Sequence, residues 1–180
     1  DQTYRDFGFM GNHEIQTPHI DRLAQQSARY VNGYLPTSVC SPSLATLLTG
    51  LYPHQSGIHY NHPPPGNTAL NKMASRKEYE TTRSQAFHLI QNVDTLPRLL
   101  AAHGYRCLQT GKFWEGHYRN AGFTEGMTIF EPVPGQSFGG NRKLANGELA
   151  AHGNGDWGLK IGRETMQPIY DFVRDCKKKE

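Results

Sequence analysis

The segment "TLPRLLAAHGYRCLQTG", residues 95–111, constrains the fold most strongly, because it joins a helix to a strand within a few residues. Its first part, "TLPRLLAAHGY", predicts a helix capped by Gly104, since glycine readily adopts the left-handed conformation that closes a last helical turn. The next part, "YRCLQTG", predicts a buried strand that leads into "GKFWEGHY". Helices that alternate with short strands are typical of α/β domains.

Apolar spacing and end signals predict three more helices, which cover residues 17–30, 42–49 and 164–179. Thr17 suits the N-cap of the first of them, and Pro18 suits its first helical position. Gly50 is expected to close the second helix. Pro168 must lie in the first turn of the third helix or bend it.

Three other segments have weaker signals. The stretch "YVNGYL", residues 30–35, predicts a short strand. Residues 54–92 are polar and lack clear periodicity, which predicts an irregular lid, binding loop or insertion. The glycine-rich residues 135–162 are also expected to form a loop.

The composition restricts the classes of protein to which the chain can belong. With 180 residues, 36% of them hydrophobic, 19 Gly and 11 Pro, it suits one loop-rich globular domain. No apolar run approaches the roughly 18 residues that a membrane span needs. The net charge of +3 permits an anionic substrate, but no stripe of basic and aromatic residues indicates nucleic-acid binding. The cysteines are too few for a disulfide framework and lack zinc-site spacing: Cys40, Cys107 and Cys176.

The segment "CSPSLATLL", residues 40–48, places a thiol at the start of a helix. Pro42 suits a first helical turn, so Cys40 is expected just before the helix, near backbone N–H groups without an intrahelical partner. These groups and the helix dipole favour negative charge, which would suit a sulfate or phosphate. The alternative is a small apolar residue packed under the helix, with Ser41 as the helix cap.

The segments "TPHIDRLAQQS" and "CSPSLATLLTGLYPHQSGIH" resemble the N-terminal part of a type I sulfatase, of the alkaline phosphatase superfamily. The segments "DQTYRDFGFMGN" and "GYRCLQTGKFWEGHY" resemble further blocks of that family in the same order. The resemblance implies an α/β fold, part of an alkaline-phosphatase-like sandwich with a mixed or mostly parallel sheet flanked by helices. Residues 1–180 are then expected to be the N-terminal portion of one catalytic domain, without its first strand and its C-terminal half.

The resemblance also implies a reaction, which is the calcium-dependent hydrolysis of a sulfate ester, in particular of a sulfated glycan. In the family, the cysteine of a Cys-x-Pro-x-Arg signature is oxidised to formylglycine by a formylglycine-generating enzyme. The hydrated aldehyde then attacks the sulfur, which divides a difficult step into two. By resemblance Cys40 is the precursor of this nucleophile and also a metal ligand. Family habit further implies a periplasmic or secreted protein.

Leu44 occupies the place of the signature arginine. In the family that arginine belongs to the motif read during maturation and braces the nucleophile, and leucine offers neither charge nor hydrogen-bond donors. On packing grounds Leu44 is expected to point inward with Leu47 and Leu48. Two other functions therefore stay open: a pseudo-sulfatase that binds sulfated ligands without turnover, and a phosphonate or phosphate ester hydrolase on the same fold.

Three more site residues follow from the resemblance. Asp1 corresponds to the second of two adjacent aspartates that bind calcium, and carboxylate oxygens suit a hard cation. Lys112 corresponds to the lysine that contacts the sulfate and the nucleophile. The family usually has histidine where this chain has Trp114, so His117 is the candidate catalytic histidine. Without the resemblance, each of the three would be read as a solvated surface residue.

Overall fold

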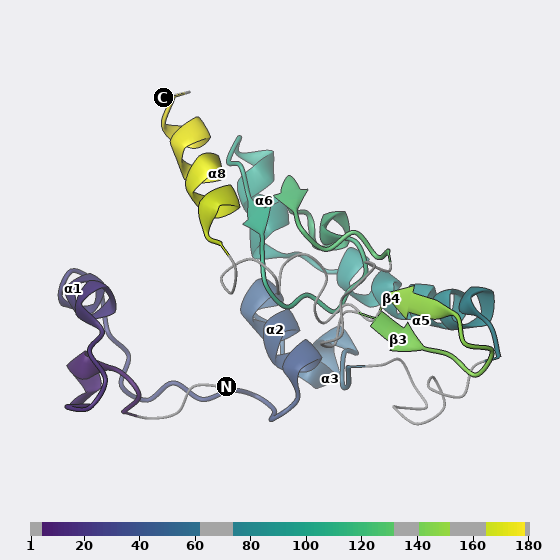
Figure 1. Ribbon diagram of the computed structural model, residues 1–180, viewed down its shortest axis with the longest axis horizontal. Coiled ribbons are helices and arrows are strands. Elements are labelled where there is room, and N and C mark those ends of the chain that lie inside the picture. The colour runs from purple at the N-terminus through teal and green to yellow at the C-terminus, as the bar shows by residue number, and fades with distance from the viewer. Residues whose placement is uncertain (1–4, 62–73, 132–140, 152–164, 179–180) are drawn as a thin grey trace. The chain divides into compact units, whose positions relative to one another are not determined.

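The computed structural model describes four ranges of the chain, residues 5–61, 74–131, 141–151 and 165–178. The chain divides into two compact units, Asp1–Tyr34 and Leu35–Glu180, each of which has its own internal packing (Figure 1). None of the described helices is long and apolar enough to cross a membrane.

The first unit contains a short 3-10 helix, η1 (Gly8–Met10), and α1 (Pro18–Gln25). Thr17 occupies the predicted N-cap position of α1, but its side chain makes no capping bond to the helix. Its hydroxyl instead accepts the Gly8 N–H at 2.9 Å and donates to Asp21 Oδ1 at 2.8 Å. Of the helix predicted over residues 17–30, the structure confirms the part from Pro18 to Gln25.

The strand predicted over residues 30–35 is wrong, because the structure shows neither strand nor helix there. Tyr30, Val31 and Tyr34 are 89%, 83% and 88% exposed. The β-branched and aromatic residues suit a pleated surface, but a strand also needs a partner for its backbone N–H and C=O groups. Within the described residues, no segment pairs with this one.

The second unit mixes helices with short strands, which confirms the predicted α/β class. Its elements, in chain order, are α2 (Cys40–Thr49), α3 (Pro53–Ser56), α5 (Arg76–Gln91), α6 (Leu96–Ala102), β1 (Leu108–Gln109), η2 (Tyr118–Ala121), β2 (Glu125–Gly126), β3 (Asn141–Lys143), β4 (Leu149–Ala151) and α8 (Gln167–Lys177). Strands β1 and β2 are parallel, with Leu108 opposite Glu125, and β3 and β4 form an antiparallel hairpin. The predictions for α2, α6, β1 and α8 are confirmed, although β1 is only two residues long.

A hydrophobic core holds α2, α5 and η2 of the second unit together, and a smaller cluster of Tyr79, Leu144 and Ala150 packs the β3–β4 hairpin on α5. The buried members of the core come from α2, α5, η2 and the loops between them, namely Ala45, Ile58, Ile90, Phe113 and Ala121. Phe113 also packs edge to face against Phe123, with ring centroids 6.0 Å apart. Burial of these side chains from water is the main force that keeps α2 next to the chain segment after β1.

Helix α5 corrects the expectation that residues 54–92 are irregular, as does the one-turn helix α3. Ser75 caps the start of α5, because its hydroxyl accepts the Glu78 N–H at 3.3 Å. Four buried side chains lie on one face of the helix: Tyr79, Arg83, Phe87 and Ile90. The arginine interrupts the apolar stripe, which explains why periodicity alone missed the helix. Residues 62–73 of that region lie outside the described residues.

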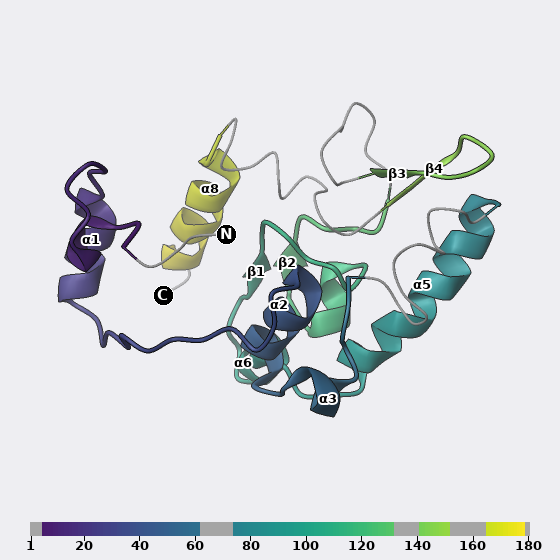
Figure 2. The same cartoon turned by 90° about the horizontal axis from the view of Figure 1, so that it is seen from below.

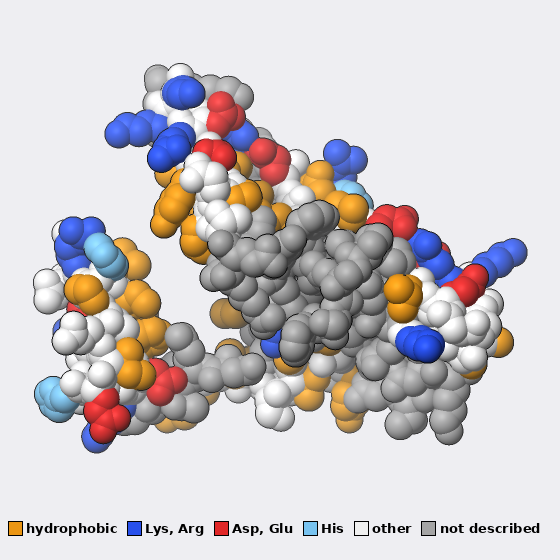
Figure 3. Space-filling view, viewed as in Figure 1, with side chains coloured by type: hydrophobic (Ala, Val, Ile, Leu, Met, Phe, Trp, Pro, Cys, Tyr) orange, Lys and Arg blue, Asp and Glu red, His pale blue; other side chains and the backbone are white. Residues whose placement is uncertain are grey.

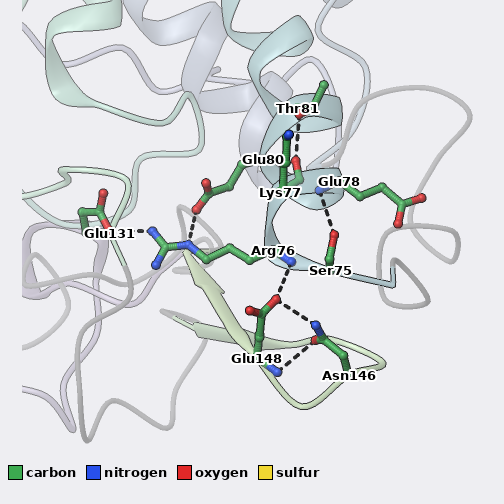
Figure 4. A network of polar contacts seen from close by, with 9 residues as sticks. All are labelled: Ser75, Arg76, Lys77, Glu78, Glu80, Thr81, Glu131, Asn146 and Glu148. Carbon is green, nitrogen blue, oxygen red and sulfur yellow. Dashed lines mark hydrogen bonds and ion pairs between the residues drawn. The ribbon is translucent and has the colours of Figure 1, made fainter.

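The β3–β4 hairpin corrects part of the loop expected over residues 135–162, and it lies against the N-terminal end of α5 (Figures 1 and 2). Arg76 links the two through the network in Figure 4: its backbone N–H donates to Glu148 Oε2 at 2.8 Å, and its guanidinium contacts Glu80 and Glu131. The bond from Asn146 and then the Arg76 N–H lower the pKa of the Glu148 carboxyl. A carboxylate is favoured at a helix N-terminus, so Glu148 joins the hairpin to α5.

Helix α8 begins at Gln167 with Pro168 in its first turn, as predicted. Basic side chains of its last turn gather at its C-terminal end (Figure 3), where they oppose the negative end of the helix dipole. Arg106 connects α8 to the β1–β2 pair, because its guanidinium makes a two-pronged contact with Glu125 and a 2.7 Å contact with Asp175. The same guanidinium lies 4.9 Å from the Phe172 ring centroid.

We expect Arg106→Ala to release α8 from the β1–β2 pair while the apolar core stays folded. Amide hydrogen exchange over residues 167–177 should then become faster, and exchange over α2 and α5 should stay unchanged. Arg174→Ala is the control, since it also removes one arginine from the same region but its 3.6 Å pair with Asp171 is exposed. Equal acceleration in both variants would show that Arg106 does not hold the helix.

Candidate functional site

Helix α2 begins at Cys40, with Val39 in the N-cap position, so the prediction that Cys40 lies just before the helix is wrong. Valine has no side-chain oxygen, so it cannot accept a bond from the first helical turn. Asn61 takes this role from twenty residues further along the chain, because its Oδ1 accepts the Ser41 N–H at 2.8 Å. The start of α2 is thus capped by a distant residue.

The sequence predicts unpaired backbone N–H groups at the start of this helix. At two positions this prediction is wrong. The Ser41 N–H is bonded to Asn61, and the Ser43 N–H donates to the Val39 carbonyl at 3.3 Å. Pro42 has no N–H to offer. These three positions therefore offer no free N–H to an anion near Cys40.

The sequence indicated Ser41 as an alternative helix cap, but the Ser41 hydroxyl binds a residue outside α2. Ser41 Oγ donates to Glu115 Oε1 at 2.8 Å, and the two residues are only 2% and 6% exposed. This bond joins the residue after Cys40 to a residue that lies between Lys112 and His117. The structure therefore brings the segments of three predicted site residues together.

Arg83 of α5 completes the arrangement and is only 1% exposed. One of its terminal nitrogens donates to the Asn61 carbonyl at 2.8 Å, and the other donates to the Trp114 carbonyl at 2.7 Å. Since Trp114 is bonded to Glu115 through the chain, these contacts close a ring through Ser41, Asn61, Arg83, Trp114 and Glu115. We call these five residues the polar ring.

The polar ring borders a small, partly open space. The volume available to water molecules is about 30 Å³, and His59 and Tyr60 also line it. A space of this size holds about one or two water molecules. Burial raises the pKa of the Glu115 carboxyl, while the Ser41 bond and the Arg83 charge act in the opposite direction. Burial is the largest of these effects, so the protonated acid is favoured relative to an exposed glutamate.

The other residues considered in the sequence analysis differ in their exposure to solvent. Lys112 is exposed in the loop after β1. Trp114, which stands where the family usually has histidine, is buried at 4% exposure. Leu44 is half-buried, as expected, but the prediction that Leu47 packs inward with it is wrong, because Leu47 is 66% exposed. The half-buried Leu48 packs against the core.

His117 is half-buried and caps η2 through its ring. Its Nδ1 accepts the Arg119 N–H at 3.2 Å, so a neutral His117 carries its hydrogen on Nε2. Burial, and secondly the Arg119 charge, lower the pKa of the His117 imidazole. At neutral pH this histidine is therefore uncharged and holds one N–H that it can donate.

The calcium site expected from the resemblance falls partly outside the described residues, because Asp1 is not among them. Within the described ranges, no group of three or more His, Cys, Asp or Glu is placed to hold a metal ion. Calcium prefers six or more oxygen ligands. The described part of the chain therefore brings no cluster of three acidic side chains to Cys40 as calcium ligands.

Sequence reasoning missed Asn61, Arg83 and Glu115. Their contacts link residues that are between 20 and 74 positions apart, so no local pattern contains them. A weak signal was present in "KFWEG", where a single carboxylate stands among large apolar residues that become buried. Such a carboxylate requires a buried partner.

We expect protonation of His117 to weaken the fold around η2. Because the folded-state pKa lies below the ordinary value of 6.5, its contribution is present above pH 6.5 and is lost as pH falls through the folded pKa. His117→Asn should keep an acceptor for the Arg119 N–H but remove this pH dependence, whereas His117→Ala should cost about 0.5–1 kcal/mol at pH 7. NMR titration of the imidazole and urea unfolding between pH 5 and 8 measure both. An imidazole pKa above 6.5 would contradict the assignment.

The comparisons with known proteins agree on one family. The Sulfatase family model matches residues 1–148. A sulfatase of Formosa agariphila is 30% identical over 166 residues, which cover 88% of this chain and 30% of that protein. The N-sulphoglucosamine sulphohydrolase of Homo sapiens is 47% identical over 55 residues, or 31% of this chain and 11% of that protein.

A solved structure agrees with these matches. The crystal structure of Ps i-CgsB is 28% identical, with a TM-score of 0.50 over 72% of this chain and 27% of that chain. The chain spans less than a third of the length of each of these relatives. Because the family model covers most of its residues in one continuous match, this chain belongs to the sulfatase family.

Proposed function

We propose that the protein hydrolyses a sulfate ester to an alcohol and inorganic sulfate, with residue 40 as the reacting group. One observation carries the proposal: the bond from Ser41 to Glu115 holds the start of α2 against the segment that contains Lys112 and His117. These are the residues to which the family resemblance assigns the reaction. Their segments are far apart in the sequence and meet at a buried contact.

The nucleophile of the proposal is a formylglycine made from Cys40, whose hydrate supplies a geminal diol for attack on sulfur. Cys40 is half-buried at the first position of α2, with its backbone fixed by the bonds of Ser41. Lys112 is exposed and carries a positive charge that suits the oxygens of a sulfate group. In the proposal, Asp1 and Cys40 are the residues of this chain that bind calcium.

His117 is the candidate general acid. An acid must donate a proton to the departing alcohol oxygen, so in this role His117 acts as the protonated imidazolium and returns to the neutral ring after the transfer. Its pKa is lowered, so only a minor fraction of His117 is protonated at neutral pH, and that fraction rises as pH falls. The proposed role therefore favours activity below neutral pH.

A sulfated sugar is the proposed substrate class. The human relative is named for the sulfated sugar on which it acts, N-sulphoglucosamine. The space beside the polar ring is small, so in this proposal the substrate binds outside it, where the exposed Lys112 can reach the sulfate group. Export to the periplasm or the outside of the cell is part of the same proposal.

Leu44 favours a second function, a pseudo-sulfatase that binds sulfated ligands but does not turn them over. The side chain is half-buried in α2 and supplies neither the charge nor the donors of the signature arginine. A thiol that is never oxidised would leave the site without its nucleophile. The two functions differ in the chemical state of residue 40.

The sulfatase proposal predicts turnover of an aryl sulfate by the intact protein when it is produced together with a formylglycine-generating enzyme. Cys40→Ala should lower kcat by at least about 10³-fold, because it removes the nucleophile. Release of the phenol, followed by absorbance, measures the rate. Equal rates for the two proteins would exclude residue 40 as the reacting group.

The state of residue 40 separates the two functions directly. Peptide mass spectrometry across Cys40 should show the aldehyde mass in the natural sequence if the protein is a sulfatase. A Leu44→Arg variant, prepared in parallel, shows whether the maturation enzyme acts on the protein at all. Conversion in the variant alone would favour the pseudo-sulfatase.

A further inference from the structure

The polar ring fixes Ser41 from two sides. Its N–H is held by Asn61 Oδ1 and its hydroxyl by Glu115 Oε1, each at 2.8 Å. Arg83 then links the two holding segments, because it donates to the carbonyls of Asn61 and Trp114. Each hydrogen bond in this ring has an ordinary length, and the bonds to Glu115 and to the Trp114 carbonyl are buried, whereas the two bonds to Asn61 are partly buried.

The ring acts on the residue whose position matters most for the proposed reaction. Cys40 is bonded directly to Ser41, and Val39 on its other side supplies no cap. The orientation of residue 40 therefore depends on where the ring holds Ser41. A reacting group misplaced by about 1 Å can cost about 10²-fold in rate, so such control has a chemical consequence.

We propose that Arg83 and Glu115 are positioning residues for residue 40, which they orient by holding Ser41 and Asn61 at the start of α2. This inference rests on the proposed function in one respect, because it assumes that residue 40 is the group that reacts. Neither residue touches a substrate in the proposal. Glu115 acts through the hydroxyl of Ser41, and Arg83 acts through Asn61, which holds the Ser41 N–H.

The chemistry of the two side chains fits this role. A guanidinium presents several donors in a fixed plane, so Arg83 can satisfy two carbonyls from different segments at once, whereas a lysine ammonium lacks that geometry. Glu115 needs only an acceptor oxygen to bind the Ser41 hydroxyl. Glu115→Gln keeps such an oxygen, and Glu115→Ala removes it and leaves a buried hydroxyl without its acceptor.

The thiol of unconverted Cys40 gives a test that does not require sulfatase activity. The intact protein, produced without the maturation enzyme, is treated with iodoacetamide, and alkylation of each cysteine is followed by peptide mass spectrometry. Cys107 and Cys176 are also free and half-buried, so they report general loosening of the fold.

We expect Ser41→Ala and Glu115→Ala to alkylate at Cys40 about tenfold faster than the natural protein, because a lost buried bond allows the first turn of α2 to open. Rates at Cys107 and Cys176 should stay within about twofold. Glu115→Gln should restore the slow rate at Cys40. Thr46→Val is the matched control, since it removes a hydroxyl bond to the Leu51 carbonyl from the other half of the same helix.

Faster alkylation at all three cysteines, or an unchanged rate at Cys40 in Ser41→Ala, would overturn the inference. Ser41→Ala is the smaller change and keeps the test decisive if Glu115→Ala does not fold. In converted protein, Ser41→Ala should lower kcat with little change in KM, because orientation rather than binding is lost. If the natural protein shows no turnover while the alkylation pattern holds, the positioning role stands and the proposed function fails.

Discussion

The hydrogen bond from Ser41 Oγ to Glu115 Oε1 is the contact on which the arrangement of this site depends. It joins two segments that lie 74 residues apart, and the two residues are only 2% and 6% exposed. In such surroundings an unpaired polar group is costly. Exclusion of water thus turns one ordinary hydrogen bond into a strong constraint on the register of α2 against the segment after β1.

Burial of Glu115 also explains why the surrounding groups are polar. A carboxyl removed from water must lose its charge or find partners, and here its pKa is raised by burial while Ser41 and Arg83 oppose that change. Arg83 must be satisfied in turn, and it binds two backbone carbonyls. The apolar core and the polar ring are therefore mutually dependent, since the core makes the ring necessary and the ring fixes the loops that cover the core.

Local signals predicted the parts of the fold that local physics decides. Gly50, at a positive φ of 70°, ends α2 where the sequence indicated, and the helix before Gly104 is confirmed. Helix α5 was missed because Arg83 interrupts its apolar face, and the strand at 30–35 was wrong because strand formation depends on a distant partner. The same distinction applies to the site: a motif indicated Cys40, whereas Arg83 acts only through tertiary contacts.

The leucine at position 44 is easier to interpret once the polar ring is known. Under the proposed function, leucine in the place of the signature arginine leaves residue 40 without that charge, but the start of α2 still has polar anchors, since Ser41 is bonded to both Asn61 and Glu115. Arg83 supplies a buried guanidinium to this region, and it binds backbone carbonyls. Within that proposal, Arg83 can brace the start of α2 in place of the missing arginine. It does not replace that arginine in recognition by the maturation enzyme. Orientation of residue 40 and its oxidation are thus separate properties, and leucine at position 44 bears chiefly on the second.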